Sequence, residues 1–147
     1  MHPFSRMPVV AGMAVSALLL VSSPLLAESV KLAAMLDGAQ ESPPVETDGK
    51  GMAELTFDTE TKKLDWTVDY SGLSGPAAAA HFHGPADKGA NADVAVPLQG
   101  DLASPIKGEA TLTDAQAADL LAGRYYLNIH TAAHQGGEIR GQVEKAM

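Results

Sequence analysis

Short runs in which apolar and polar side chains alternate make up most of this sequence. The clearest is KLDWTVDYS, residues 63–71, in which Leu64, Trp66 and Val68 alternate with aspartate and threonine. A period of two puts successive side chains on opposite faces of a β-strand, so this run fits a strand with one buried and one wet face. The preceding run GMAELTFD, residues 51–58, has the same pattern. Because the link between them is short and polar, the two runs predict an antiparallel hairpin.

Further strands are predicted on the same grounds at residues 29–36, 92–98, 107–112, 124–131 and 137–144. Clusters rich in Gly, Pro, Asn and Asp separate them, as is typical of turns and loops. One of these clusters, ESPPVETDGKG at residues 41–51, is predicted to be a surface loop. Many short strands of this kind predict an all-β fold, a Greek-key β-sandwich or barrel of about 7–9 strands.

A single segment, LTDAQAADLLAG, departs from the alternation. It offers Thr113 as an N-cap, Gln116 three residues later, and Gly123 as a stop after a helix-forming stretch. A capping box followed by a glycine is the usual pattern of a short helix. We therefore expect one short helix near residues 114–122.

The first 27 residues follow a different order. MHPFSRM carries one Arg and no acid, an uncharged apolar run follows, and SSPLLA ends in a small residue before Glu28. This is the order of a secretory signal peptide, and the apolar run is short for a membrane span. We predict a signal peptide at residues 1–27 and a single domain at 28–147. The domain is then exported, periplasmic or secreted, with no membrane association after signal removal.

Composition narrows the possible partners and activities. The formal net charge is −8, and Arg6 is the only charged residue in the predicted signal, so the remainder is more acidic still. A chain this acidic is a poor partner for nucleic acid. The sequence has no cysteine, so an exported fold must rest on its core without disulfides. It also lacks the usual hydrolase, zinc-protease and phosphate-loop motifs, so we predict no catalytic residue and favour a protein that is not an enzyme.

The four histidines outside the predicted signal fall in two short segments, AAAAHFHGPA and NIHTAAHQGGEIRG. Phe82 is the natural core residue of the first segment, so His81 and His83 are expected to point outward on the same side. In the second segment Ile129 belongs to the better core face. His130 is therefore expected to face away from the core as well.

The last two predicted strands are joined by AAHQG, a suitable hairpin loop. Pairing that keeps the core faces together sets Ile129 opposite Ile139. It also places His130 opposite Glu138, with Arg140 diagonal to His130. The residues expected on this outer patch are His130, Glu138, Arg140 and, at the hairpin tip, His134.

Histidines two residues apart on a strand lie about 6.6 Å apart along it, so both rings can turn towards one ion. If the strand of His130 lies beside that of the paired histidines, three imidazoles can converge, and such nitrogen ligands suit copper or zinc. The candidate metal ligands are His81, His83, His130 and His134, with Glu138 and Arg140 as supporting or anion-binding residues. The same histidines can equally be structural, holding the sheet and loops through hydrogen bonds.

Three segments carry a resemblance to a known family: DGAQESPPVETDGKG, YSGLSGPAAAAHFHGPA and GRYYLNIHTAAHQGGEIRGQV. Between about Leu32 and Val143 the chain resembles the CHRD domain, which is named after chordin. The resemblance implies an all-β extracellular or periplasmic domain, and chordin's binding of growth factors gives a precedent for protein binding. Two functions follow: an exported binding module that holds copper or zinc through its histidines, or a metal-free protein-interaction module whose partner is unknown.

A second likeness is to the copper site of Cu,Zn superoxide dismutases, which also has an H-x-H strand and a later strand bearing a histidine. In this likeness His81 and His83 match the paired copper ligands, His130 matches the ligand on the late strand, and Arg140 matches the anion-guiding arginine. The zinc-binding loop and the disulfide are missing, and His134 has no counterpart there. The likeness implies shared architecture and copper as a cofactor; dismutase-like redox chemistry is the least favoured function.

Overall fold

The computed structural model describes residues 22–23 and 27–147, so the predicted signal peptide lies almost entirely outside the described residues. The elements, in chain order, are β1 (Ser29–Asp37), the 3-10 turn η1 (Gly38–Gln40), β2 (Lys50–Asp58), β3 (Lys63–Ser71), β4 (Ala79–His83), β5 (Val94–Pro97), β6 (Ile106–Thr111), α1 (Asp114–Leu121), β7 (Tyr126–His130), β8 (Ile139–Gln142) and β9 (Glu144–Lys145). The prediction of an all-β fold with one short helix is confirmed. The last predicted strand is divided into β8 and β9.

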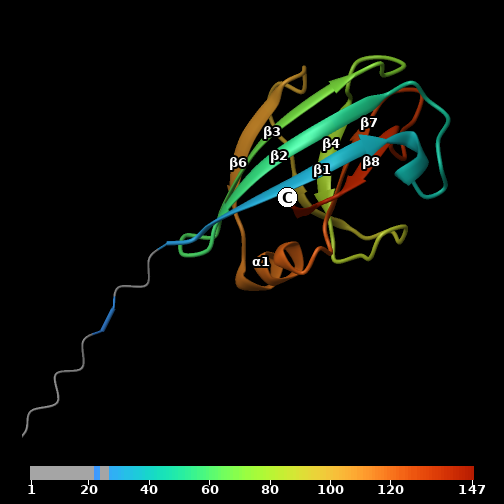
Figure 1. The fold of residues 1–147 in the computed structure, drawn as a ribbon. Helices are drawn as coiled ribbons and strands as arrows, with labels where there is room; N and C mark the ends of the chain where they lie inside the picture. Colours follow the sequence, from blue (N-terminus) through green and yellow to red (C-terminus); the bar gives the residue numbers. More distant parts are fainter. Residues whose placement is uncertain (1–21, 24–26) are drawn as a thin grey trace, which may run out of the picture.

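The strands form one antiparallel sheet that curls into a nearly closed barrel, with α1 at one end (Figure 1). Hydrogen-bonded neighbours follow the order β5-β4-β7-β8-β1-β2-β3-β6, and β9 also pairs with β1. After β3 the chain crosses to the hairpin β4–β5 and returns in β6 to pair with β3. This return beside an earlier strand is a Greek-key type of connection, as predicted.

The alternation of apolar and polar side chains sets the register of the two predicted hairpins. Leu55 on β2 lies opposite Trp66 on β3, which joins the two core faces. On β7 and β8, Ile129 lies opposite Ile139, as the parity argument predicted. Since a slip of one residue would exchange the two faces of a strand, burial of these apolar side chains fixes both registers.

The buried core of the described residues is mostly aliphatic, and its aromatic members are Phe57, Trp66, Phe82 and Tyr125. Trp66 and Phe82 meet edge to face, with ring centroids 5.4 Å apart, and so join β3 to β4 across the interior. Gly108 on β6 makes room for the indole, because a Cβ there would lie 2.8 Å from the Trp66 ring. The Trp66 side chain therefore packs against both Gly108 on β6 and Phe82 on the core face of β4.

The helix α1 begins and ends as the sequence predicted. The Thr113 side chain accepts a hydrogen bond from the Gln116 backbone, and the Gln116 side chain accepts one from the Thr113 backbone. Gly123 follows the helix with a φ of 75°, a conformation that favours glycine. In the part of the chain that the structure describes, no helix combines the length and hydropathy needed to cross a bilayer.

Removal of the N-cap hydroxyl is expected to destabilise the protein slightly. In Thr113→Ala the Gln116 backbone N–H loses its acceptor, and such a loss costs about 1 kcal/mol. Urea unfolding measures the change in the free energy of unfolding. Thr113→Ser keeps the hydroxyl and serves as the control; an equal loss in both variants would contradict a capping role.

The face of β7 and β8 that points away from the barrel interior is not exposed, contrary to the prediction of an outer patch. Its buried side chains are Tyr126, Asn128, Glu138, Arg140 and Gln142. The loop that joins β4 to β5 covers part of this face through hydrogen bonds with Tyr126, Arg140 and Gln142, and the Ser74 backbone contacts Glu138. Arg140 donates hydrogen bonds to Asn91 and to the Ala90 carbonyl in the covering loop. The fold therefore has a second, polar buried layer outside the barrel.

Candidate functional site

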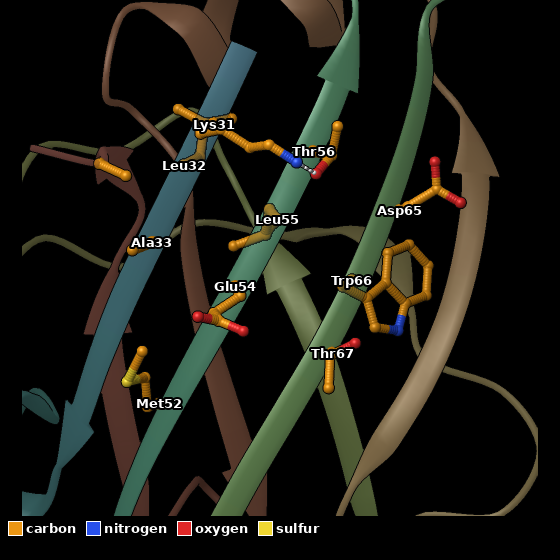
Figure 2. Close-up of a pocket in the computed structure, with 11 residues that line it drawn as sticks. Lys31, Leu32, Ala33, Met52, Glu54, Leu55, Thr56, Asp65, Trp66 and Thr67 are labelled. Carbon is orange, nitrogen blue, oxygen red and sulfur yellow. Dashed lines mark hydrogen bonds between the residues drawn. The ribbon is translucent and has the colours of Figure 1, made fainter. Parts of the chain in front are cut away.

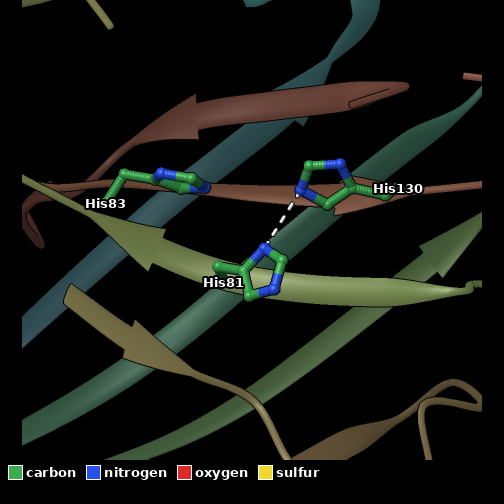
Figure 3. A group of neighbouring side chains, drawn as sticks. All are labelled: His81, His83 and His130. Atoms are coloured by element: carbon green, nitrogen blue, oxygen red, sulfur yellow. Dashed lines mark hydrogen bonds between the residues drawn. The ribbon is translucent and has the colours of Figure 1, made fainter. Parts of the chain in front are cut away.

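Three histidines meet at the edge of this polar layer, and a single ring nitrogen from each lies within 4.8 Å of the others (Figure 3). His81 and His83 project from the outer face of β4 because Ala80 and Phe82 occupy the core face. His130 comes from the adjacent strand β7. His81 Nδ1 and His130 Nε2 lie 3.1 Å apart. The convergence that the H-x-H spacing predicted is present.

Backbone carbonyls fix the tautomers of two of these rings. His83 Nδ1 lies 2.9 Å from the Ala92 carbonyl, and His130 Nδ1 lies 2.8 Å from the Gln135 carbonyl. A carbonyl oxygen can only accept, so each Nδ1 must carry the proton. In the neutral ring each Nε2 then keeps a free lone pair. Metal-bound histidines are commonly oriented in this way by a hydrogen bond from the other ring nitrogen.

The surroundings of His81 and His83 favour the neutral form of these two rings. Burial lowers the pKa of His81, and the neighbouring imidazoles of His130 and His83 lower it further. Burial also lowers the pKa of His83, although its hydrogen bonds to Ala92 and Asn128 act in the opposite direction. The neutral imidazole is the form that can donate a lone pair to a metal.

A stack of planar groups continues from the histidines into the buried layer. The His83 ring lies parallel to the Tyr126 ring, with centroids 4.7 Å apart. On the Tyr126 ring lies the guanidinium of Arg140, 3.4 Å from its centroid. The Tyr126 hydroxyl in turn donates to the Ala92 carbonyl at 3.2 Å. The stack therefore packs His83 against a rigid support.

The other predicted site residues lie apart from the three histidines. Glu138 and Arg140 are 0% and 2% exposed, so they are buried residues rather than members of a surface patch. Glu138 accepts hydrogen bonds from the Ser74 backbone, and His134 Nε2 lies 3.5 Å from Glu138 Oε1. His134 is thus directed to Glu138 and does not join the group formed by the other three.

Glu41 was missed by the sequence argument, which placed it in a surface loop. It is 7% exposed, and its Oε1 has no hydrogen-bond partner among the described residues. Burial raises the pKa of Glu41 to about 7, although the charge of Arg140 and a hydrogen bond from Asn128 act to lower it. Close packing is maintained by Gly137, where a Cβ would lie 2.3 Å from Glu41 Oε1.

Asn128 is the residue that links Glu41 to the histidines. Its Oδ1 lies 3.0 Å from His83 Nε2 and 2.9 Å from His130 Nε2. The parity of β7 placed Asn128 on the outer face, but its position between two rings depends on the orientation of its amide. The orientation of the amide depends on tertiary contacts, and the alternation of side chains in the sequence does not indicate it.

A separate depression of about 490 Å³ lies on the outer face of β1, β2 and β3 (Figure 2). Lys31 crosses it and donates a hydrogen bond to Thr56 Oγ1 at 2.7 Å. Met52, Glu54 and Asp65 also line it, and none of the histidines does. Its mixture of charges and its hydrogen-bonded lysine give no convergent donor set, so the histidine group remains the candidate site.

Comparison with curated proteins and with solved structures gave no match. The likeness to Cu,Zn superoxide dismutase therefore stays a prediction. Comparison with known families matched the CHRD domain over residues 32–143, a range that includes most of β1, all of β2 to β8 and all three converging histidines. The chain belongs to the CHRD domain family.

Proposed function

We propose that this protein is an exported binding module that holds one copper or zinc ion through His81, His83 and His130. The observation that carries the proposal is the approach of three ring nitrogens to within 4.8 Å of one another. Export is supported by the order of charge, apolar run and small residue in the first 27 residues, and by membership of the CHRD family.

The spacing of the donors supports an ion of this size. Nitrogen ligands at about 2.0–2.1 Å from a metal, with tetrahedral or square geometry, lie about 2.9–3.4 Å from one another. His81 Nδ1 and His130 Nε2 already have this spacing, at 3.1 Å. His83 offers Nε2, since its Nδ1 is engaged by Ala92. Small adjustments of the side chains then complete the set.

Isothermal titration calorimetry of the metal-free protein with Cu(II) and with Zn(II) tests the proposal. We expect one ion per chain in the native protein. The double variant His81→Ala/His130→Ala loses two of the three ligands. We expect its affinity for the ion to fall by at least about 100-fold, which is more than the loss of a residue that only orients a ligand would cause. The matched control is His134→Ala, because His134 faces Glu138; it is expected to bind as the native protein does.

A metal-free protein-interaction module, in which the histidines only hold the sheet and loops, is the alternative. It predicts no stoichiometric uptake by the native protein. It also predicts that each lost hydrogen bond in a His→Ala variant costs about 1 kcal/mol of stability and nothing else. Native-like ion binding in the double variant would rule out the three-histidine site.

A further inference from the structure

We infer that Asn128 is a fourth ligand of the same ion, binding through Oδ1, and that the resulting three-nitrogen, one-oxygen set selects Cu(II). The inference rests on the proposed metal site and extends it, since Asn128 belongs to no predicted ligand set. It is carried by the position of Asn128 Oδ1, which lies 3.0 Å from His83 Nε2 and 2.9 Å from His130 Nε2.

The four donors follow one another at nearly equal steps. The steps are 3.1 Å from His81 Nδ1 to His130 Nε2, 2.9 Å from there to Asn128 Oδ1, and 3.0 Å from Oδ1 to His83 Nε2. Each of these three steps is close to the edge of about 2.9 Å in a square of ligands at metal–ligand distances near 2.0–2.1 Å. Three of the four edges are thus present, and a ring nitrogen of His83 lies within 4.8 Å of one of His81. Tetragonal nitrogen and oxygen sets are typical of Cu(II).

A cation suits the position of Oδ1 when the rings of His83 and His130 are neutral. Because the rings of His83 and His130 place their protons on Nδ1 towards backbone carbonyls, each neutral ring turns a lone pair to Asn128 Oδ1. An amide oxygen facing two lone pairs is unfavourable, and a metal ion between them removes the conflict. Rotation of the amide by 180° would offer its N–H₂ group instead.

The environment of Asn128 opposes that rotation. On the other side of the amide, Asn128 Nδ2 and Glu41 Oε1 both lie against Gly137, at 2.7 Å and 2.3 Å from the place a Cβ would occupy there. The amide N–H₂ group therefore lies on the side of Glu41, and Oδ1 lies on the side of the histidines. Rotation would bring the amide oxygen close to Glu41, whose ionised carboxylate offers only acceptors. In that form Glu41 favours the orientation of Oδ1 towards the histidines.

Two substitutions of Asn128 separate a ligand from a hydrogen-bond donor. Asn128→Leu removes the oxygen, and we expect the dissociation constant for Cu(II) to rise by more than about 100-fold, beyond the 10–100-fold that is typical of a residue that only orients a ligand. We also expect a changed parallel hyperfine splitting in the electron paramagnetic resonance spectrum. Asn128→Asp keeps an oxygen at the same position and removes the amide N–H₂. It is expected to bind Cu(II) at least as tightly as the native protein, because a carboxylate is the stronger donor.

The matched control is Gln99→Glu, which adds the same charge at an exposed position after β5, away from the histidines and the covering loop. It should leave both the affinity and the spectrum unchanged. Loss in Asn128→Leu with retention in Asn128→Asp supports the inference. Native affinity and spectrum in both Asn128 variants would overturn it while leaving the three-histidine site in place. A native protein that binds no Cu(II) would overturn both.

Folding of each variant is checked by circular dichroism before titration. If Asn128→Leu does not fold, the electron paramagnetic resonance spectrum of the Cu(II) form of Asn128→Asp is the remaining test of whether Asn128 is a ligand. A carboxylate ligand in place of an amide must change the Cu(II) parameters, whereas a residue outside the coordination sphere leaves them as in the native protein. An unchanged spectrum in folded Asn128→Asp therefore overturns the inference.

Discussion

Replacement of Arg140 by methionine is expected to lower the free energy of unfolding by about 2–4 kcal/mol, because two part-buried hydrogen bonds from a charged group are lost. Arg140 is 2% exposed and donates to the Asn91 side chain and the Ala90 carbonyl. Its guanidinium also stacks on Tyr126, a contact worth about 1–2 kcal/mol when desolvated. Methionine fills similar space but leaves both acceptors without their donor.

Urea unfolding of the metal-free protein at pH 7, followed by tryptophan fluorescence, measures this loss. Trp66 is the sole tryptophan of the sequence and lies in the barrel interior, so its signal reports unfolding of the barrel. Arg124→Met is the matched control. Arg124 is on the surface, with its side chain 45% exposed and ion pairs to Asp87 and Asp119 at 3.5 and 4.0 Å, so its removal should cost less than about 1 kcal/mol. Equal losses in the two variants would contradict a structural role for the buried guanidinium.

The consequences of losing Arg140 reach the histidine site through the covering loop. Ala92, which accepts from His83 Nδ1, lies one residue beyond Asn91, the partner of Arg140. The same loop is held at Ala86, whose carbonyl accepts from the Gln142 side chain. The network therefore stabilises both the loop and the ring orientation that leaves His83 Nε2 free for a metal.

Alternation of side chains was sufficient to predict the elements that carry the site. It gave the β7–β8 register, in which Asn128 lies opposite Arg140, and the outward direction of His81 and His83. These results depend only on the period of two and on burial of one apolar face. For the same reason the helix α1, which has its own capping pattern, was predicted to within about one residue at its end.

The covering of the outer face could not be predicted in the same way. Polar side chains such as Asn128 and Arg140 on alternate positions look alike whether water or a loop lies above them. The segment containing Glu41 has the composition of a surface loop, and only tertiary packing on β8 buries it. The position of His134 also followed from packing, since its partner Glu138 is held by the Ser74 backbone from a distant loop.

Substitution of Glu41 by glutamine is expected to stabilise the metal-free protein at alkaline pH by about 3 kcal/mol and to change how stability depends on pH. Burial raises the pKa of Glu41 from its ordinary value of 4.5 to about 7. The folded protein therefore binds a proton more tightly than the unfolded chain does. Stability from this group is complete below pH 4.5 and is lost as the pH rises through 7, at about 1.4 kcal/mol for each unit of pKa difference.

The two histidines with lowered pKa act in the opposite direction. Because His81 and His83 bind protons less tightly in the folded protein than in the unfolded chain, their contribution is present above their ordinary pKa of 6.5 and is lost as the pH falls. The pH profile of the native protein combines both trends. The difference between Glu41→Gln and the native protein removes the histidine contribution and isolates that of Glu41.

Urea unfolding between pH 5 and pH 8, in the presence of a chelator, gives this difference directly. It should grow with pH, because glutamine keeps an oxygen for the Asn128 amide and carries no charge that burial could oppose. Glu46→Gln, at an exposed position in the same loop, should give a flat difference. If the difference in the free energy of unfolding between Glu41→Gln and the native protein also did not change with pH, Arg140 and Asn128 would compensate the buried carboxylate fully. Glu41 would then be ionised at neutral pH, and the polar layer would hold a complete ion pair beside the histidines.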